Sequence, residues 1–315
     1  MLSCLPCLPL PLHYLLYKVR IFTSSAAILS QRRISTASAE GPASQGKCDC
    51  IDILQLDIDR ETPLKGTIAV YNAHVLASTG KSDWNSKIEL EDGLVADLKG
   101  VLGRAGLGKG FNDLPNNVIL TTNSSYPSSP SVSQHGRYSS AYVFPQNIYL
   151  PVVPHSSSAT STSEAHVQFI RTYLLPATNT FVHAAGLPHG PRKVHETHVL
   201  ICTHNSRDTR CGIIGPMINQ LFTAYLSSKG LLHPEDPDIS VRGKVRVGNI
   251  SHIGGHKFAG NVIVYLPPEK DSWNQGGKGI WYGRVGGQAN VERIVDETVL
   301  GGKIIQELLR GGIGI

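Results

Sequence analysis

Two short segments, Cys202-Thr-His-Asn-Ser-Arg-Asp-Thr-Arg-Cys211 and His252-Ile-Gly-Gly-His256, decide how this chain is organised. Each segment begins and ends with a side chain that binds metals. Cysteine thiolates and histidine imidazoles are the donors that zinc, copper and iron centres take in proteins. We therefore expect the four side chains at the segment ends to close around one metal centre.

The spacing of the cysteines favours an iron-sulfur cluster over a zinc site. Eight residues separate Cys202 from Cys211, whereas a structural zinc site draws its cysteines from a knuckle with about two to four intervening residues. A longer loop suits a [2Fe-2S] cluster, in which each iron takes its own ligand pair. Rieske centres also have two histidine ligands on one iron, but they interleave cysteines with histidines, and here both cysteines come first. The predicted cofactor is a [2Fe-2S] cluster on Cys202, Cys211, His252 and His256.

Hydrophobic patterns around these segments predict an α/β domain over residues 191–315. A buried strand ends at Cys202, and a helix begins near Cys211, where the positive end of the helix dipole favours a thiolate. Gly254 and Gly255 permit a tight turn between the histidines. The remaining expected elements are strands at Lys244–Ile250, Asn261–Leu266 and Gly279–Arg284 and a final helix at Val291–Arg310. This element order is typical of a thioredoxin-like fold.

At this point the chain resembles a known family. A widely spaced cysteine pair after the first strand, followed by a second ligand pair in a later loop, is similar to thioredoxin-like [2Fe-2S] ferredoxins. With His-x3-His as the second pair, the chain resembles the sucrase/ferredoxin-like family of fungi, most clearly from Val194 to the C-terminus. The resemblance implies mitochondrial redox or thiol homeostasis, without identifying a partner.

Residues 1–39 have the composition of a mitochondrial presequence. They contain no acidic residue, and their basic residues are Lys18, Arg20, Arg32 and Arg33. Without them the formal charge of +5 falls to about +1, so the charge gives no argument for nucleic-acid binding. No uninterrupted apolar stretch is long enough to cross a membrane. We expect a mitochondrial protein without a membrane span.

Residues 40–153 are expected to form an N-terminal α/β domain with a Ser/Pro-rich loop at 123–140, joined by a linker and connecting helix at 154–190. His74-Val-Leu-Ala-Ser-Thr79 parallels His198-Val-Leu-Ile-Cys-Thr203 and sets Ser78 where the second half has Cys202. This match indicates a degenerate thioredoxin-like copy without metal ligands, serving as a scaffold or docking surface.

Several residues near the predicted cluster have no assigned role. Cys48 and Cys50 are expected to be reduced thiols, with a redox pair or an accessory ligand pair as the alternatives. His204, inside the first ligand loop, is expected to support the ligands or face solvent, with a third imidazole ligand as the alternative. A set of basic side chains is expected to surround the cluster: Arg207, Arg210, Arg242, Lys244, Arg246 and Lys257.

Three functions remain open from the sequence. The favoured one is a non-enzymatic carrier that exchanges single electrons with a redox partner protein, for which a flavoprotein reductase is one candidate. The second is a thiol-disulfide oxidoreductase that uses Cys202 and Cys211 directly. The third is an interaction module stabilised by zinc. Neither an acid-base pair nor a substrate pocket can be assigned, and the oligomeric state is not predicted.

Overall fold

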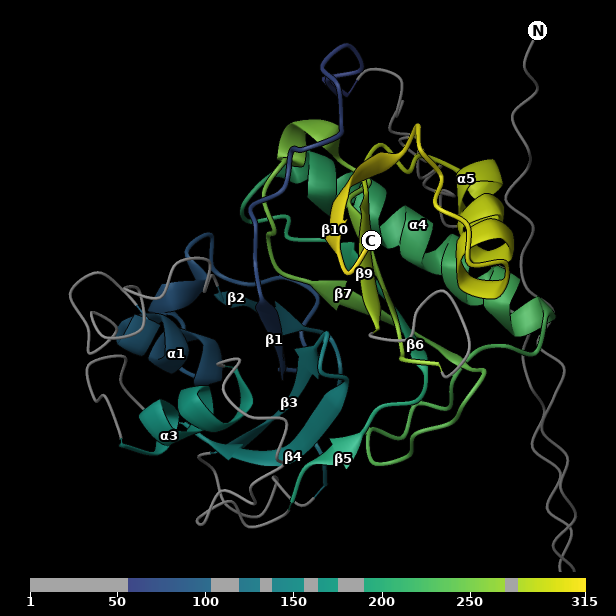
Figure 1. Ribbon diagram of the computed structural model, residues 1–315. Coiled ribbons are helices and arrows are strands. Elements are labelled where there is room, and N and C mark those ends of the chain that lie inside the picture. The colour runs from purple at the N-terminus through teal and green to yellow at the C-terminus, as the bar shows by residue number, and fades with distance from the viewer. Residues whose placement is uncertain (1–55, 103–118, 131–137, 156–163, 175–189, 270–276) are drawn as a thin grey trace, which may run out of the picture. The chain divides into compact units, whose positions relative to one another are not determined.

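The computed structural model describes residues 56–102, 119–130, 138–155, 164–174, 190–269 and 277–315 (Figure 1). The predicted presequence, Cys48 and Cys50 lie outside these residues. All described residues belong to one compact unit that spans Ile51–Ile315.

The second half of the chain has the strand order expected of a thioredoxin-like fold. Strands β6 and β7 are parallel, and β8 and β9 follow as antiparallel neighbours in the order β7-β6-β8-β9. Helix α4 makes the crossover between the two parallel strands. The elements are β6 (Thr197–Cys202), α4 (Thr209–Ser228), β7 (Val245–Ile250), β8 (Val262–Leu266) and β9 (Lys278–Tyr282). The predicted strands and the helix after Cys211 are therefore confirmed.

The predicted helix at the C-terminus is wrong in its second part. Helix α5 (Gln288–Arg293) continues as a π-helical segment, η4 (Ile294–Leu300), and ends at Gly301. Gly302 then adopts φ +67°, a conformation that glycine tolerates and that ends helices. The last two residues of the expected helix, Leu309 and Arg310, instead begin strand β10 (Leu309–Ile313), which pairs antiparallel with β9.

The first half repeats the same succession of elements. In chain order they are β1 (Ala73–Ser78), η2 (Ile88–Leu90), α1 (Leu94–Leu102), β2 (Ile119–Ser124), β3 (Tyr138–Phe144), β4 (Ile148–Pro154), α3 (Glu164–Tyr173) and β5 (Arg192–Lys193). Two expectations need correction. The loop predicted at 123–140 includes the end of β2 and the start of β3. The sequence alone also suggested a single strand over 141–153, and this stretch is the greater part of a hairpin formed by β3 and β4.

The ten-stranded sheet is symmetric in its strand order. It runs β10-β9-β8-β6-β7-β2-β1-β3-β4-β5, so each half contributes the same five positions in mirrored sequence. The halves meet where β2 pairs antiparallel with β7, at Ser124 and Ile250. The parallel between His74–Thr79 and His198–Thr203 is thus matched in the fold, because Ser78 and Cys202 are each the last residue of the first strand of their repeat.

Side chains on one face of each half-sheet pack against the other half. The Phe144 ring on β3 stacks on the Tyr265 ring on β8 with centroids 4.1 Å apart, and the Tyr142 ring meets the His198 ring at 4.9 Å. A second apolar cluster lies between strands of the first half and helices α1 and α3. In Figure 1, α1 and α3 lie beside the first half of the sheet, and α4 and α5 lie beside the second. The continuous sheet and this shared core leave the prediction of two separate domains unconfirmed.

In the part of the chain that the structure describes, no helix has the length and apolar character needed to cross a membrane.

Candidate metal centre

The parallel pairing of β6 and β7 brings the two ligand segments together. Cys202, the last residue of β6, is in register with Ile250, the last residue of β7. His252 follows two residues later, and His256 begins the short helix η3 (His256–Phe258). Residues far apart in sequence therefore meet at the carboxyl ends of two neighbouring strands.

Cys202 and Cys211 are free, buried thiols in contact with each other. Each is 1 % exposed. A hydrogen bond between them lowers the pKa of Cys202, with a further contribution from His252, and the same bond raises the pKa of Cys211. The pair therefore gives up its first proton easily and holds its second.

Helix α4 holds Cys211 close to the end of β6. The Asp208 carboxylate caps the helix by accepting a hydrogen bond from the Arg210 main-chain N–H at 3.0 Å. A Cβ atom on Gly215 would lie 2.4 Å from the carbonyl oxygen of Cys202. Only glycine permits this approach, so the helix backbone rests directly against the strand that carries Cys202.

His252 and His256 lie beside each other with their ring centroids 5.3 Å apart. Nδ1 of His256 is buried and has no hydrogen-bond partner among the described residues, and burial lowers the pKa of this imidazole. Its Nε2 lies 3.7 Å from the Asp208 carboxylate. A neutral imidazole with an unpartnered nitrogen is the form that binds a metal.

His204 is tied to the main chain and holds the second ligand loop. Its Nε2 lies 3.0 Å from the carbonyl oxygens of Trp84 and of Asn85. Carbonyl oxygens only accept hydrogen bonds, so Nε2 carries the proton, and Nδ1 accepts from the main-chain N–H of His252 at 3.0 Å. Both ring nitrogens are therefore occupied in positioning the loop.

A loop of the first half forms one wall of the centre. The Thr203 hydroxyl donates to the carbonyl oxygen of Ser82 at 2.7 Å, and the Ser206 hydroxyl donates to the Asp83 carboxylate at 2.7 Å. The sequence predicted a scaffold or docking role for the first half without locating this contact, which joins residues about 120 positions apart.

Asn261 forms hydrogen bonds to both ligand segments, and Arg310 forms hydrogen bonds to Asn261 and to the second segment. Neither residue was identified from the sequence as part of the site. Each is 1 % exposed. Asn261 accepts from the Cys202 N–H through its main-chain oxygen at 3.0 Å and donates through its side chain to the Gly255 oxygen at 2.9 Å. Arg310 donates to the Asn261 side-chain oxygen at 2.8 Å and to the Gly254 oxygen at 3.2 Å.

The buried Arg310 guanidinium is a positive charge that interacts with both thiols. Burial lowers its pKa to about 10, while Cys202 and Cys211 act in the opposite direction. It therefore stays charged at neutral pH and favours a negative charge on the sulfurs. The sequence placed Arg310 at the end of a helix, so its contribution was invisible there.

The expected basic surroundings are confirmed only in part. The positive charges of Arg207 and Arg210 lower the pKa of His256, and Arg210 also forms an ion pair with Asp208. Arg246 is buried in an ion pair with Glu196, and Arg242 contacts His195. Lys257 pairs with Asp59, and Lys244 donates to the Gly230 carbonyl.

Among the described residues, no group of three or more His, Cys, Asp and Glu side chains converges on the position of a single metal ion. A two-iron cluster needs only two protein ligands at each iron, so its four ligands do not have to converge on one point. Two adjoining thiols and two adjoining imidazoles, with one imidazole nitrogen unpartnered, form a donor set that fits such a cluster.

Comparison with known proteins gives one family match and several relatives. A family model described as sucrase/ferredoxin-like matches residues 64–311. Altered inheritance of mitochondria protein 32 of Debaryomyces hansenii is 31 % identical and covers 90 % of this chain and 99 % of its own length. The protein of the same name from Clavispora lusitaniae is 31 % identical over 81 % of this chain and 85 % of its own. Actin patches distal protein 1 of Saccharomyces cerevisiae is 26 % identical over 73 % of this chain and 70 % of its own.

Among solved structures, a thioredoxin-like [2Fe-2S] ferredoxin from Aquifex aeolicus aligns with 38 % of this chain and 94 % of its own. The two share 14 % identity with a TM-score of 0.25.

Proposed function

Because this chain belongs to the sucrase/ferredoxin-like family, as the match over residues 64–311 shows, we propose that it carries electrons on a [2Fe-2S] cluster bound by Cys202, Cys211, His252 and His256. The observation that carries the proposal is that the cysteine pair and the histidine pair adjoin each other. Cys202 contacts both Cys211 and His252, and the two imidazoles lie side by side.

The cluster, when bound, supplies a one-electron redox couple, and two imidazoles in place of two thiolates favour a higher potential. The protein's own task is to present the donors in the right protonation state. The mutual hydrogen bond prepares the Cys202 thiol to lose its proton. The positive end of α4 and the charge of Arg310 both stabilise thiolates.

The two ligand pairs differ in their access to solvent. The cysteines are buried, whereas the His256 side chain is 43 % exposed. His252 also lines a cavity of about 610 Å³ beside α1 and β2. The histidine side is therefore where an electron-exchange partner approaches, and a flavoprotein reductase is one such partner.

The relatives' names associate those proteins with mitochondria. Together with the acid-free composition of residues 1–39, they support a mitochondrial location for this chain and a part in redox or thiol homeostasis.

A second candidate, thiol-disulfide exchange by Cys202 and Cys211, is favoured by one observation. The two free thiols are in contact, and the lowered pKa of Cys202 makes it a ready nucleophile. No observation favours the third possibility, a structural zinc ion. Such an ion needs donors that converge on one point, and the described residues contain no such group.

Visible absorption of the anaerobically purified full chain tests the proposal. We expect a coloured protein that bleaches on reduction, and loss of the colour in Cys202→Ser and in His256→Ala. His195→Ala is the matched control, because His195 contacts Arg242 away from the centre, and it should keep the colour. A colourless wild-type protein whose two thiols form a disulfide would support the second candidate instead.

A further inference from the structure

Residues 57–67, which we call the strap, precede the first repeat in sequence but bind to the second half. In Figure 1 this segment is the purple trace that passes beside the second half and then leads into β1. The Asp59 main-chain N–H donates to the Lys257 carbonyl oxygen at 2.9 Å, and the Gly66 N–H donates to the Arg310 carbonyl oxygen at 2.8 Å. The strap is therefore fixed to the second half at two points.

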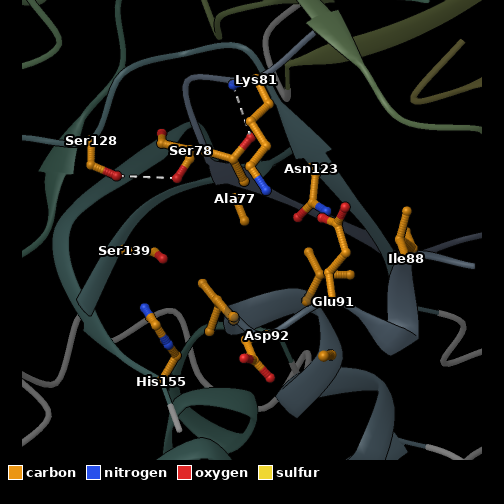
Figure 2. A pocket seen from close by; sticks show the side chains of 15 residues that line it. Ala77, Ser78, Lys81, Ile88, Glu91, Asp92, Asn123, Ser128, Ser139 and His155 are labelled. Atoms are coloured by element: carbon orange, nitrogen blue, oxygen red, sulfur yellow. Dashed lines mark hydrogen bonds between the residues drawn. The ribbon is translucent and has the colours of Figure 1, made fainter. Parts of the chain in front are cut away.

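The two halves offer equivalent positions, of which one carries thiols. The corresponding place in the first half holds a cavity of about 250 Å³ near the end of β1 (Figure 2), and none of the described residues that line it is a cysteine. Cys202 and Cys211 are at this place in the second half. The strap thus lies on the half that contains the candidate metal centre, although it is continuous with the other half.

Asp59 is the residue at which many of the strap's contacts meet. Its carboxylate lies 2.8 Å from Nζ of Lys257 and 3.5 Å from Nη2 of Arg284. It also accepts the main-chain N–H groups of Glu61 and Thr62, at 3.1 Å and 2.9 Å, which fixes the turn of the strap. The hydrogen bonds from Lys257 and Thr62 hold the pKa of Asp59 well below its usual range, so its carboxylate is charged at neutral pH.

Both cations that pair with Asp59 also hold the short helix η3, which His256 begins. Lys257 directly follows His256. The Arg284 main-chain N–H donates to the carbonyl oxygen of Phe258, the last residue of η3, at 3.0 Å. Nζ of Lys257 and Cζ of Arg284 lie 4.8 Å and 5.2 Å from the centroid of the buried Phe258 ring. Asp59 is therefore connected to a candidate ligand through two side chains.

The strap also binds two cations on the cysteine side of the centre. Arg210, which immediately precedes Cys211, donates from Nη1 to the Asp57 carbonyl oxygen at 2.8 Å. Arg310, whose charge interacts with both thiols, donates to the Thr67 carbonyl oxygen at 2.7 Å and to its hydroxyl at 3.0 Å. The contacts of the strap therefore reach both ligand segments.

We propose, on the basis of the electron-carrier function, that Asp59 is a positioning residue that keeps the two ligand segments closed around the metal centre through Lys257 and Arg284. Cys202 and Cys211 are each 1 % exposed, so a metal or a dissolved reagent reaches them only when these segments move apart. The Lys257 side chain is 49 % exposed. Salt therefore screens its attraction to Asp59 and makes opening easier.

Alkylation of the reduced, metal-free full chain by iodoacetamide tests the proposal without a bound cluster. Peptide mass spectrometry separates Cys202 and Cys211 from the other cysteines. We expect Asp59→Asn, which removes the charge but keeps an acceptor for the Thr62 N–H, to be alkylated about 3-fold faster than the wild type. Asp59→Ala, which also removes the turn, should be alkylated at least ~10-fold faster.

The salt response separates positioning from a general loss of stability. Raising sodium chloride from about 0.05 M to about 0.5 M should accelerate alkylation of the wild type and leave the rate of Asp59→Asn unchanged. Asp296→Asn is the matched control, because Asp296 forms an ion pair with Lys229 at 3.2 Å on the surface of the same half. It should keep the wild-type rate and salt response.

The proposal is overturned if neither Asp59 variant is alkylated faster than the wild type, or if Asp296→Asn is accelerated as much as Asp59→Asn. In the chain that carries a cluster, the Asp59 variants should also release iron to a chelator faster than the wild type. A chain that takes up no iron would contradict the electron-carrier function, whereas the alkylation rates would still decide the role of Asp59.

Discussion

A Cβ atom on Gly255 would lie 2.2 Å from Nη2 of Arg310. The turn between the two candidate histidine ligands and the C-terminal strand are thus fitted together without room for a methyl group. This contact joins the candidate metal centre to Arg310, which sequence reasoning had placed at the end of a helix.

Gly255→Ala should therefore destabilise the folded protein more than Gly254→Ala. Both glycines have positive φ, +81° at Gly254 and +70° at Gly255, but a Cβ on Gly254 meets no atom within 4 Å. We expect a loss of unfolding free energy of about 1 kcal/mol at Gly254, from backbone strain alone. At Gly255 the added clash should raise the loss to about 3 kcal/mol. Urea unfolding of the two variants measures the difference, and equal losses would contradict the contact.

Arg310→Met should destabilise the protein and weaken cluster retention. The substitution leaves the buried acceptor Asn261 Oδ1 and the partly buried Gly254 O without their donor. We expect a loss of about 2–4 kcal/mol in urea unfolding and faster loss of visible colour during dialysis against a chelator. Arg293→Met is the control, since Arg293 forms surface pairs with Glu297 and Glu307, and it should retain both properties.

His256→Cys should lower the midpoint potential of the coloured protein. A third thiolate adds negative charge at the centre and makes electron uptake less favourable, and we expect a shift of at least ~100 mV to more negative values. A redox titration followed by visible absorption gives the potential. An unchanged potential in a variant that still holds iron would show that His256 is not a ligand.

The free energy of unfolding should fall in mild acid, because His74 and His198, at matching positions in the first strands of the two halves, are buried in neutral form. Burial lowers the pKa of His74 to about 3 and that of His198 to about 4. The unfolded chain, with its histidine pKa near 6.5, takes up protons first as the pH falls. The contribution is therefore complete above about pH 6.5 and is lost progressively from there toward pH 4.

Urea unfolding between pH 7.5 and pH 5 checks this dependence. Unfolding free energies that stay constant over this range would show that His74 and His198 are not held neutral by burial.

Individual strands and helices near the candidate site were predictable because they follow from the hydrophobic pattern of the sequence. The apolar run Val199–Ile201 is strand β6, and the helical spacing after Cys211 is α4. The helix predicted to reach Arg310 failed because apolar spacing continues past Gly301 and Gly302, where the backbone changes direction. Periodicity alone does not report such a break.

The ligand candidates were found from residue type and spacing, but their support was not. Asn261, Arg310 and the loop at 82–86 reach the centre through strand pairing and long-range packing. Asparagine, arginine and serine are common surface residues, so nothing in their local sequence distinguishes these positions. The symmetric strand order likewise emerges only when both halves are folded, although the match between His74–Thr79 and His198–Thr203 indicated it.

The most direct test of the account is the metal content of the full chain purified without oxygen, measured as iron, acid-labile sulfide and zinc together with the electron paramagnetic resonance spectrum after reduction. The account predicts about two iron and two sulfide ions per chain, with a signal from a reduced two-iron cluster that disappears in Cys202→Ser. One zinc ion per chain without sulfide, or a metal-free protein with a reducible bond between Cys202 and Cys211, would contradict it.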